Sequence, residues 1–309
     1  MKILVTGAAG FAGRHLVREL LAAGHAVATT DAAPADSPAA AGLPDYAPAD
    51  LRDAAALRAL VRAARPDAAI HLAAISFVPD AAKNPTLLEE VNVGGPCNLA
   101  EALLAEAPAA RLAFVSTAQV YGASAVPGAA PFSEDAPLRP ATPYARSKAD
   151  AERALARLAA ERGLRHVVLR PANHTGPGQS PKFVAPAFAR QALAAARGEL
   201  REIRVGNLDS LRDFSDVRDV VRAYRLAVER GADGAAYNVS SGAMLRIRDL
   251  LARLLALAGA TGTPVAEDPA LWRPADEVPT LSIARIRADT GWEPEIPIDR
   301  TLRDLIATA

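Results

Sequence analysis

The chain has 309 residues, of which 50% are hydrophobic and 23% are charged, a balance typical of folded globular proteins and not of disordered ones. Its 35 basic and 35 acidic side chains cancel, so we expect neither nucleic acid nor a membrane as a partner. A single cysteine, Cys97, excludes an internal disulfide, and no Cys/His spacing suits a metal site.

No apolar run reaches the length of a signal-peptide core or of a membrane span. We therefore expect a cytoplasmic protein without a bound metal.

Strand-like and helix-like segments alternate from the first residue onward. The expected strands cover residues 2–6, 25–30, 68–72, 111–116 and 166–169, and the expected helices cover 11–23, 54–64, 85–106 and 145–162. This alternation predicts an α/β fold over residues 1–171, a doubly wound parallel sheet of the Rossmann type with helices on both faces.

The composition of the sequence and the length of its expected elements change after Pro171. The stretch PANHTGPGQSPKF is rich in proline and glycine and predicts a loop. Shorter elements follow, at 185–197, 202–205, 217–230, 236–239 and 247–257. We expect residues 172–309 to form mainly a smaller C-terminal substrate-binding cap, with some of the chain returning to the first domain.

Three glycines follow the first strand at once, in the order strand, Gly7-x-x-Gly10-x-x-Gly13, helix. Glycines permit a tight turn whose backbone N–H groups approach a pyrophosphate, and a helix N-terminus favours its negative charge. In this context the pattern predicts a dinucleotide-binding turn that also includes Phe11 and Ala12. The alternative is a glycine turn that binds no ligand.

The second strand ends at Asp31. A carboxylate there can accept hydrogen bonds from the adenosine ribose and would repel a 2′-phosphate, which favours NAD(H) over the alternative, NADP(H). Residues that follow later strands would line the same crevice, because the carboxyl ends of parallel strands meet at one edge. They are Asp50, Leu51, Leu72, Ala73 and Ala74.

In TPYARSKADAE, Tyr144 and Lys148 lie four residues apart at the start of a helix, and hence on one face. An ammonium beside a phenol, whose pKa is ordinarily ~10, would lower that pKa and make Tyr144 a usable proton donor or acceptor. Upstream, Thr117 or Ser116 in FVSTAQVYG is placed to hydrogen-bond the same reacting oxygen. The alternatives are an exposed helix pair and hydroxyls that cap a turn.

With these motifs assembled, the chain resembles the extended short-chain dehydrogenases/reductases of the NAD-dependent epimerase/dehydratase family, from VTGAAGFAGRHL to TGWEPEIPIDRTLRDLI. The resemblance implies catalytic positions at Thr117, Tyr144 and Lys148, and a supporting, cofactor-binding asparagine at Asn92 in EVNVGG. Tyr144 and Lys148 would also contact the cofactor. Relatives often dimerise through the helices matching 85–106 and 145–162, so a homodimer is expected.

In the 4,6-dehydratases of this family, acidic residues follow the threonine position within two residues. Here those positions hold Ala118 and Gln119. Neither side chain can act as a carboxylate acid or base, which disfavours dehydration and leaves reduction or epimerisation.

The stretches RPANHTGPGQSPKFVAPAFARQ, VGNLDSLRDFSDVRDVVRAY and WRPADEVPTL most resemble GDP-6-deoxy-4-keto-mannose reductases, which make GDP-rhamnose. This resemblance implies a GDP-sugar substrate and hydride transfer from NAD(P)H to C4, with Tyr144 protonating the alkoxide. The implied substrate-binding residues are Ser76, Thr117, Asn173, Arg212, Arg273 and Asp276. The alternatives are an NAD-dependent nucleotide-sugar 4-epimerase and a nucleotide sensor without activity.

Overall fold

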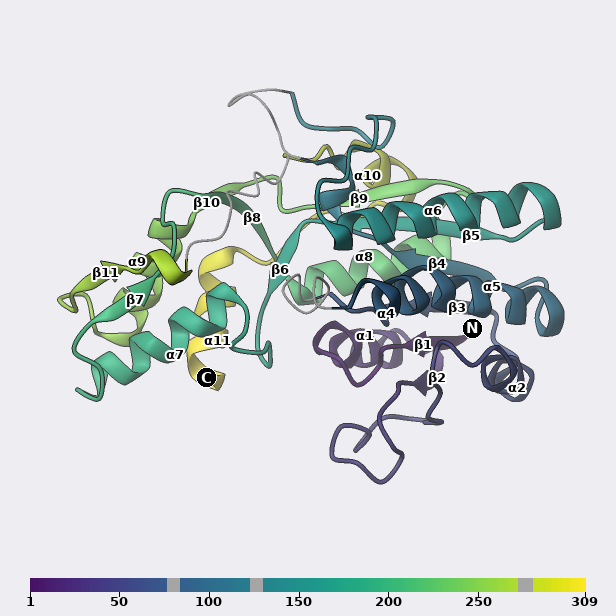
Figure 1. Cartoon of the computed structure of the whole chain (residues 1–309), viewed down its shortest axis with the longest axis horizontal. Coiled ribbons are helices and arrows are strands. Elements are labelled where there is room, and N and C mark those ends of the chain that lie inside the picture. Colours follow the sequence, from purple (N-terminus) through teal and green to yellow (C-terminus); the bar gives the residue numbers. More distant parts are fainter. Residues whose placement is uncertain (77–83, 123–129, 272–279) are drawn as a thin grey trace.

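Six parallel strands form the central sheet of the computed structural model, which describes residues 1–76, 84–122, 130–271 and 280–309 (Figure 1). Across the sheet the strands run in the order β2 (Ala26–Thr30), β1 (Lys2–Thr6), β3 (Ala68–His71), β4 (Arg111–Val115), β5 (His166–Pro171) and β9 (Ala236–Val239). The chain winds one way from β1 to β2 and the other way from β3 onward. Ligands of such sheets bind outside the strand ends at this reversal, here between β1 and β3.

Helices cover both faces of this sheet, as the alternation of the sequence predicts. On one face lie α2 (Ala54–Ala64), α5 (Gly95–Glu106) and α6 (Pro143–Arg162), and on the other α1 (Phe11–Ala22) and α8 (Val217–Arg230). Successive residues of a strand point to opposite faces. Accordingly Leu4 of β1 packs under α2 and α5, whereas Ile3 and Val5 pack under α1 and α8.

A smaller part of the molecule stands beyond the carboxyl ends of the strands and has its own apolar core (Figure 1). Its helices are α7 (Val184–Ala196), α9 (Ile247–Ala258) and α11 (Ile298–Thr308). Its short strands form two sheets, β10 (Met244–Arg246) with β8 (Leu211–Asp216) and β6 (Asn173–Thr175), and β11 (Val265–Glu267) with β7 (Ile203–Val205).

One segment after residue 171 departs from its expected structure: the stretch expected to be all loop contains β6, which pairs in parallel with β8. The helix and strand expected at 217–230 and 236–239 are a part of the chain that returns to the large sheet. Here α8 packs against α1, and β9 pairs with β5. The division of the chain at 171/172 into domains stays a prediction.

The helix expected over 85–106 is interrupted. It consists of α4 (Pro85–Glu89), a π-helical turn (Glu90–Gly94) and α5, so that the backbone bulges at Asn92. The remaining described elements are a 3₁₀ turn, η2 (Ala118–Tyr121), a second, η3 (Pro269–Leu271), and α10 (Ala284–Thr290).

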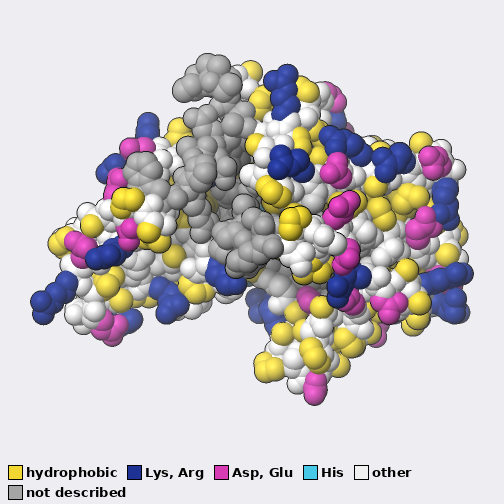
Figure 2. All heavy atoms as spheres, viewed as in Figure 1, with side chains coloured by type: hydrophobic (Ala, Val, Ile, Leu, Met, Phe, Trp, Pro, Cys, Tyr) yellow, Lys and Arg dark blue, Asp and Glu magenta, His cyan; other side chains and the backbone are white. Residues whose placement is uncertain are grey.

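Basic and acidic side chains are intermingled on the face seen in Figure 2, as the zero net charge leads one to expect. Among the described helices, none combines the length and apolar character that crossing a bilayer requires. Within the same residues, no group of three His, Cys, Asp or Glu side chains is arranged to hold a metal ion.

Candidate active site

A cavity of about 1530 Å³ runs from the glycine turn after β1 to the smaller part of the molecule. Pockets for one small ligand usually measure ~300–1,000 Å³, so this cavity has room for more than one. Most of the residues that the sequence predicts for the site line it: Gly7, Gly10, Phe11, Ala12, Gly13, Asp31, Asp50, Leu51, Leu72, Ala73, Ala74, Ser76, Thr117, Tyr144, Lys148, Asn173 and Arg212. Arg273 and Asp276 lie outside the described residues.

The glycine turn is packed so closely that side chains would not fit. Gly7 has a φ of +72°, and a Cβ there would lie 2.7 Å from the backbone nitrogen of Ala73. A Cβ on Gly13 would lie 2.2 Å from the carbonyl oxygen of Gly7. The turn thus delivers the first N–H groups of α1, which have no partner within the helix, to the cavity wall. These residues fit the pyrophosphate of a dinucleotide.

Asp31 lines the cavity at the end of β2. One carboxylate oxygen accepts a hydrogen bond from the backbone N–H of Ala9 at 3.1 Å, and the other accepts from the N–H of Ala32 at 2.8 Å. The carboxylate therefore ties the end of β2 to the glycine turn. Nearby, hydrogen bonds from the side chain and the backbone N–H of Arg52 hold the pKa of Asp50 below its usual range.

Tyr144 enters the cavity from the first turn of α6. Pro143 begins this helix, and the Thr142 hydroxyl caps it by accepting from the N–H of Ala145 at 3.1 Å. The phenol lies beside the Thr117 side chain, which lowers the pKa of Tyr144, but burial is the larger effect and raises that pKa to about 12. The two side chains expected at the reacting oxygen are thus brought together.

Lys148 lies one turn further along α6. Its Nζ donates to the carbonyl of Val115 at 2.8 Å and lies 4.8 Å from the centre of the Phe114 ring. Burial lowers the pKa of Lys148 to about 7. The structure therefore differs from the expectation that Lys148 lowers the pKa of Tyr144: desolvation of the phenol is the larger effect, and the amine is directed to a backbone carbonyl.

Asn92 is buried behind the cavity wall and is not among the residues that line it, so its expected contact with the cofactor stays a prediction. Its side-chain oxygen accepts from the N–H of Ile75 at 2.8 Å, and its amide donates to the Ser147 hydroxyl at 3.1 Å. Ile75 lines the cavity. The π-helical turn thus directs Asn92 to support the wall between β3 and α6.

The residues after Thr117 agree with the sequence reading. Ala118 is buried, and Gln119 lines the cavity with its side-chain oxygen buried and without a hydrogen-bond partner. Neither position offers a carboxylate for an elimination.

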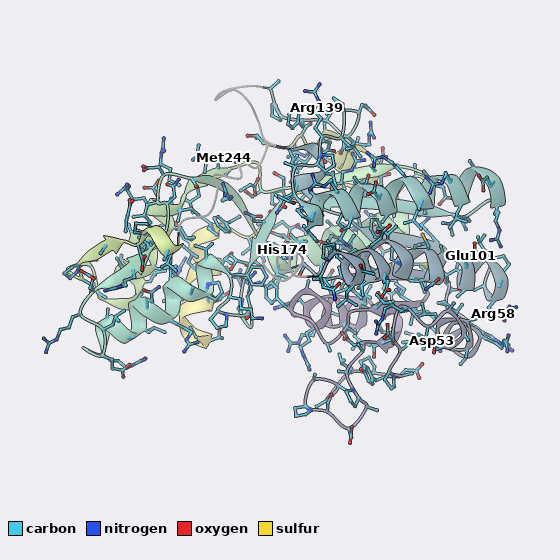
Figure 3. All side chains as sticks on the ribbon, in the orientation of Figure 1. Asp53, Arg58, Glu101, Arg139, His174 and Met244 are labelled. Carbon is cyan, nitrogen blue, oxygen red and sulfur yellow. The ribbon has the colours of Figure 1, made fainter. Side chains whose placement is uncertain are left out.

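Sequence reasoning missed much of the other end of the cavity. The charged side chains that line it there, Lys182, Arg204 and Arg212, are all cationic. His174 stacks on Phe11 with the ring centres 6.1 Å apart and lies where the two parts of the molecule meet (Figure 3). Burial lowers the pKa of His174, so its ring is neutral at physiological pH. His174 and Lys182 both lie in the stretch RPANHTGPGQSPKFVAPAFARQ, which was the available signal for them, whereas Arg204 lies outside the quoted motifs.

Residues 3–240 match the model of the NAD-dependent epimerase/dehydratase family. The chain belongs to this family. GDP-6-deoxy-D-mannose reductase of Pseudomonas aeruginosa is 37% identical over 308 residues, which is 99% of this chain and 96% of the relative. UDP-glucose 4-epimerase of Mycolicibacterium smegmatis is 34% identical over 310 residues, covering 96% of this chain and 95% of the relative.

Solved structures of family members have the same fold. The structure of RMD from Pseudomonas aeruginosa complexed with NADPH superposes with a TM-score of 0.86 at 34% identity and covers 99% of this chain and 98% of that one. The Thermus thermophilus UDP-glucose 4-epimerase complexed with NAD reaches a TM-score of 0.87 at 33% identity, over 100% of this chain and 98% of that one. Members of the family are thus known to hold either NADPH or NAD.

Proposed function

We propose that this family member reduces the 4-keto group of GDP-4-keto-6-deoxy-mannose to a GDP-6-deoxyhexose, GDP-rhamnose, with NAD(P)H. The observation that carries the proposal is the juxtaposition of Tyr144, Thr117 and Lys148, which together line one cavity. The glycine turn lies at one end of that cavity, and Lys182, Arg204 and Arg212 line the other. The similarity to GDP-6-deoxy-D-mannose reductase over 99% of the chain supports the choice of sugar nucleotide.

A few side chains carry out the proposed reduction. NAD(P)H supplies the hydride that reaches C4. Tyr144 gives its phenolic proton to the oxygen of the former ketone, and Thr117 hydrogen-bonds the same oxygen. Lys148 orients this end of the site, and the guanidinium of Arg212 binds diphosphate oxygens.

A turnover assay tests the proposal. Purified protein is mixed with GDP-4-keto-6-deoxy-mannose and either NADH or NADPH, and the loss of reduced nicotinamide absorbance is followed. Oxidation of cofactor matched mole for mole by GDP-6-deoxyhexose supports the reductase. If neither cofactor is consumed, the GDP-sugar assignment is wrong.

A second candidate is an NAD-dependent nucleotide-sugar 4-epimerase, favoured by the 34% identity to a UDP-glucose 4-epimerase over 96% of the chain. An epimerase returns the hydride to the sugar and retains its cofactor. NAD released on denaturing the purified protein, together with interconversion of UDP-sugars, would support this candidate over the reductase.

Asp31 sets the cofactor preference in our proposal. Its carboxylate lines the cavity beside the glycine turn, where it would repel a 2′-phosphate. We expect Asp31→Asn to raise the ratio of kcat/KM with NADPH to that with NADH by about tenfold, since each tenfold step corresponds to ~1.4 kcal/mol of relieved repulsion. Steady-state kinetics with both cofactors measure this ratio, and an unchanged ratio would remove Asp31 from cofactor selection.

We also propose a cytoplasmic homodimer formed by α5 and α6 of two copies. Sedimentation equilibrium of the wild-type protein should give twice the mass of the chain. Ala156 is exposed on α6, and Ala156→Arg is expected to shift the protein toward monomer by placing a charge in the helix interface. Ala63→Arg, on an exposed position of α2, is the matched control. A monomeric wild-type protein would contradict the proposal.

A further inference from the structure

Three side chains on one face of α6 contact the end of β4 and the two residues that follow it. Tyr144, Lys148 and Glu152 follow each other at intervals of one helical turn. They meet the consecutive residues 115–117: Tyr144 lies beside the third residue, Lys148 donates to the carbonyl of the first at 2.8 Å, and the Glu152 carboxylate accepts from the hydroxyl of the second. The first two contacts belong to the site already described. The third has no assigned role.

Glu152 is part of a buried ion pair with Arg170 of β5. Both residues are 7% exposed. The guanidinium Nη2 donates to one carboxylate oxygen at 2.6 Å, and Nε lies 3.2 Å from both oxygens. Such a forked pair fixes orientation as well as distance. Glu152 thus holds Ser116 in a defined position relative to β5.

A further N–H group of Arg170 bonds residues that follow Thr117 in the chain. Nη1 donates to the Tyr121 hydroxyl at 2.8 Å and to the carbonyl of Glu134 at 3.0 Å. Tyr121 in turn donates to the side-chain oxygen of Asn238 at 2.7 Å. One guanidinium therefore connects α6, the turn after Thr117, and β9.

Asn238 carries the connection to two further segments. Its amide donates to the carbonyls of Phe132 at 3.0 Å and of Ser282 at 3.1 Å. These two segments also pair with each other, since the N–H of Ser282 donates to the carbonyl of Phe132 at 2.9 Å. The network thus extends from Glu152 to the backbone of Phe132 and Ser282.

Stability alone does not account for a charged pair in this place. A buried ion pair is typically no more stabilising than apolar side chains of similar volume, because both ions lose their hydration. What a forked, fully hydrogen-bonded pair does provide is a single relative position for the elements it joins.

We propose that the Glu152–Arg170 pair is a positioning unit for the reaction, which holds Thr117 and Lys148 in register with Tyr144. The expected effect on kcat rests on the proposed function, whereas the expected effect of Glu152 on the titration of Lys148 does not. Neither residue lines the cavity, so the pair acts through the residues it holds.

The charge of Glu152 has a separate, measurable effect on Lys148. Burial lowers the pKa of Lys148 to about 7, and the Glu152 carboxylate opposes this by raising it. The other titratable groups facing Lys148 are Tyr144 on its own helix and His71 of β3, whose pKa burial lowers to about 3, so that both are neutral near pH 7. Glu152→Gln removes the carboxylate and leaves Arg170 uncompensated. Both changes lower the pKa of Lys148 further.

Lysine NMR tests this without relying on turnover. The chain has four lysines, Lys2, Lys83, Lys148 and Lys182, so protein labelled with ¹³C at the lysine ε-carbon gives four signals, and Lys148→Met assigns one. In Glu152→Gln we expect the Lys148 signal to titrate at least one pH unit lower than in the wild type. Ser116→Ala removes the hydroxyl contact but no charge, so there the signal should titrate as in the wild type.

Kinetics test the positioning role in the same variants. Glu152→Gln should lower kcat by about 10- to 100-fold, as expected for a small misplacement of reacting groups. The KM for the sugar nucleotide and the Kd for NAD(P)H should stay within about threefold of wild type, because no contact with either is removed. Glu152→Asp keeps the charge and should recover part of the loss.

A well-folded Glu152→Gln protein with wild-type kcat and an unshifted Lys148 titration would overturn the proposal. If circular dichroism shows that this variant does not fold, Ser116→Ala and Tyr121→Phe replace it. Each of them breaks one contact of the network and should lower kcat several-fold at constant KM. Wild-type kcat in both variants would overturn the proposal. If the wild-type protein itself shows no turnover, the proposed function fails, and the lysine titration still decides on the pair.

Discussion

Tyr144→Phe is expected to lower kcat for reduction of the keto sugar by about 10²–10⁴-fold, the usual contribution of one positioned proton donor. The phenol lies beside Thr117, and burial holds its pKa at about 12, so it carries its proton at neutral pH and is ready to donate it. The Kd for NAD(P)H, measured by fluorescence, should change little, because the benzene ring remains. Single-turnover kinetics give the rate of the chemical step directly.

Tyr237→Phe is the matched control. Tyr237 is also fully buried, and its hydroxyl accepts from the N–H of Ala232 at 2.7 Å and donates to Asp289 at 2.8 Å, but it does not line the cavity. This variant loses the same atom and should lose thermal stability, not kcat. Equal kcat values in the two variants would show that Tyr144 is not the proton donor.

Gly13→Ala is expected to abolish detectable NAD(P)H binding at concentrations that saturate the wild type. A Cβ at Gly13 would meet only backbone: the carbonyl oxygen of Gly7 at 2.2 Å, and Cα and the carbonyl oxygen of Ala8 at 2.7 and 2.8 Å. The turn must therefore open, which moves the N–H groups that would hold the pyrophosphate and costs about 1–3 kcal/mol of folding free energy. Isothermal titration with NADH and NADPH, and thermal melting, measure the two effects.

Gly262→Ala makes the same substitution where no atom lies within 4 Å of the added Cβ and the glycine has no positive φ. It should bind cofactor as the wild type does and melt at nearly the same temperature. Wild-type affinity in Gly13→Ala would contradict the assignment of the turn as the dinucleotide cradle.

The sequence by itself determined the features that depend on neighbouring residues. Buried strands, the glycine turn and the helices that cover the sheet are local patterns of apolar residues and turn formers, and helix Ala54–Ala64 begins and ends where they predict. The pairing of Tyr144 with Lys148 on one face of α6 follows in the same way, from a spacing of one helical turn. So does the lining of the cavity by Asp31, at the end of β2.

Only the tertiary structure decided features that depend on residues far apart in the chain. The sequence predicts that some of residues 172–309 return to the first domain but not which ones, because strand pairing is not encoded locally; in the structure strand β9 pairs with β5 in the large sheet. The π-helical turn places Asn92 behind the wall of the cavity. The ion pair between Arg170 of β5 and Glu152 of α6 joins two elements whose contact the sequence does not predict. The pKa values of Tyr144 and Lys148 depend on how completely each group loses water, which spacing along a helix does not reveal.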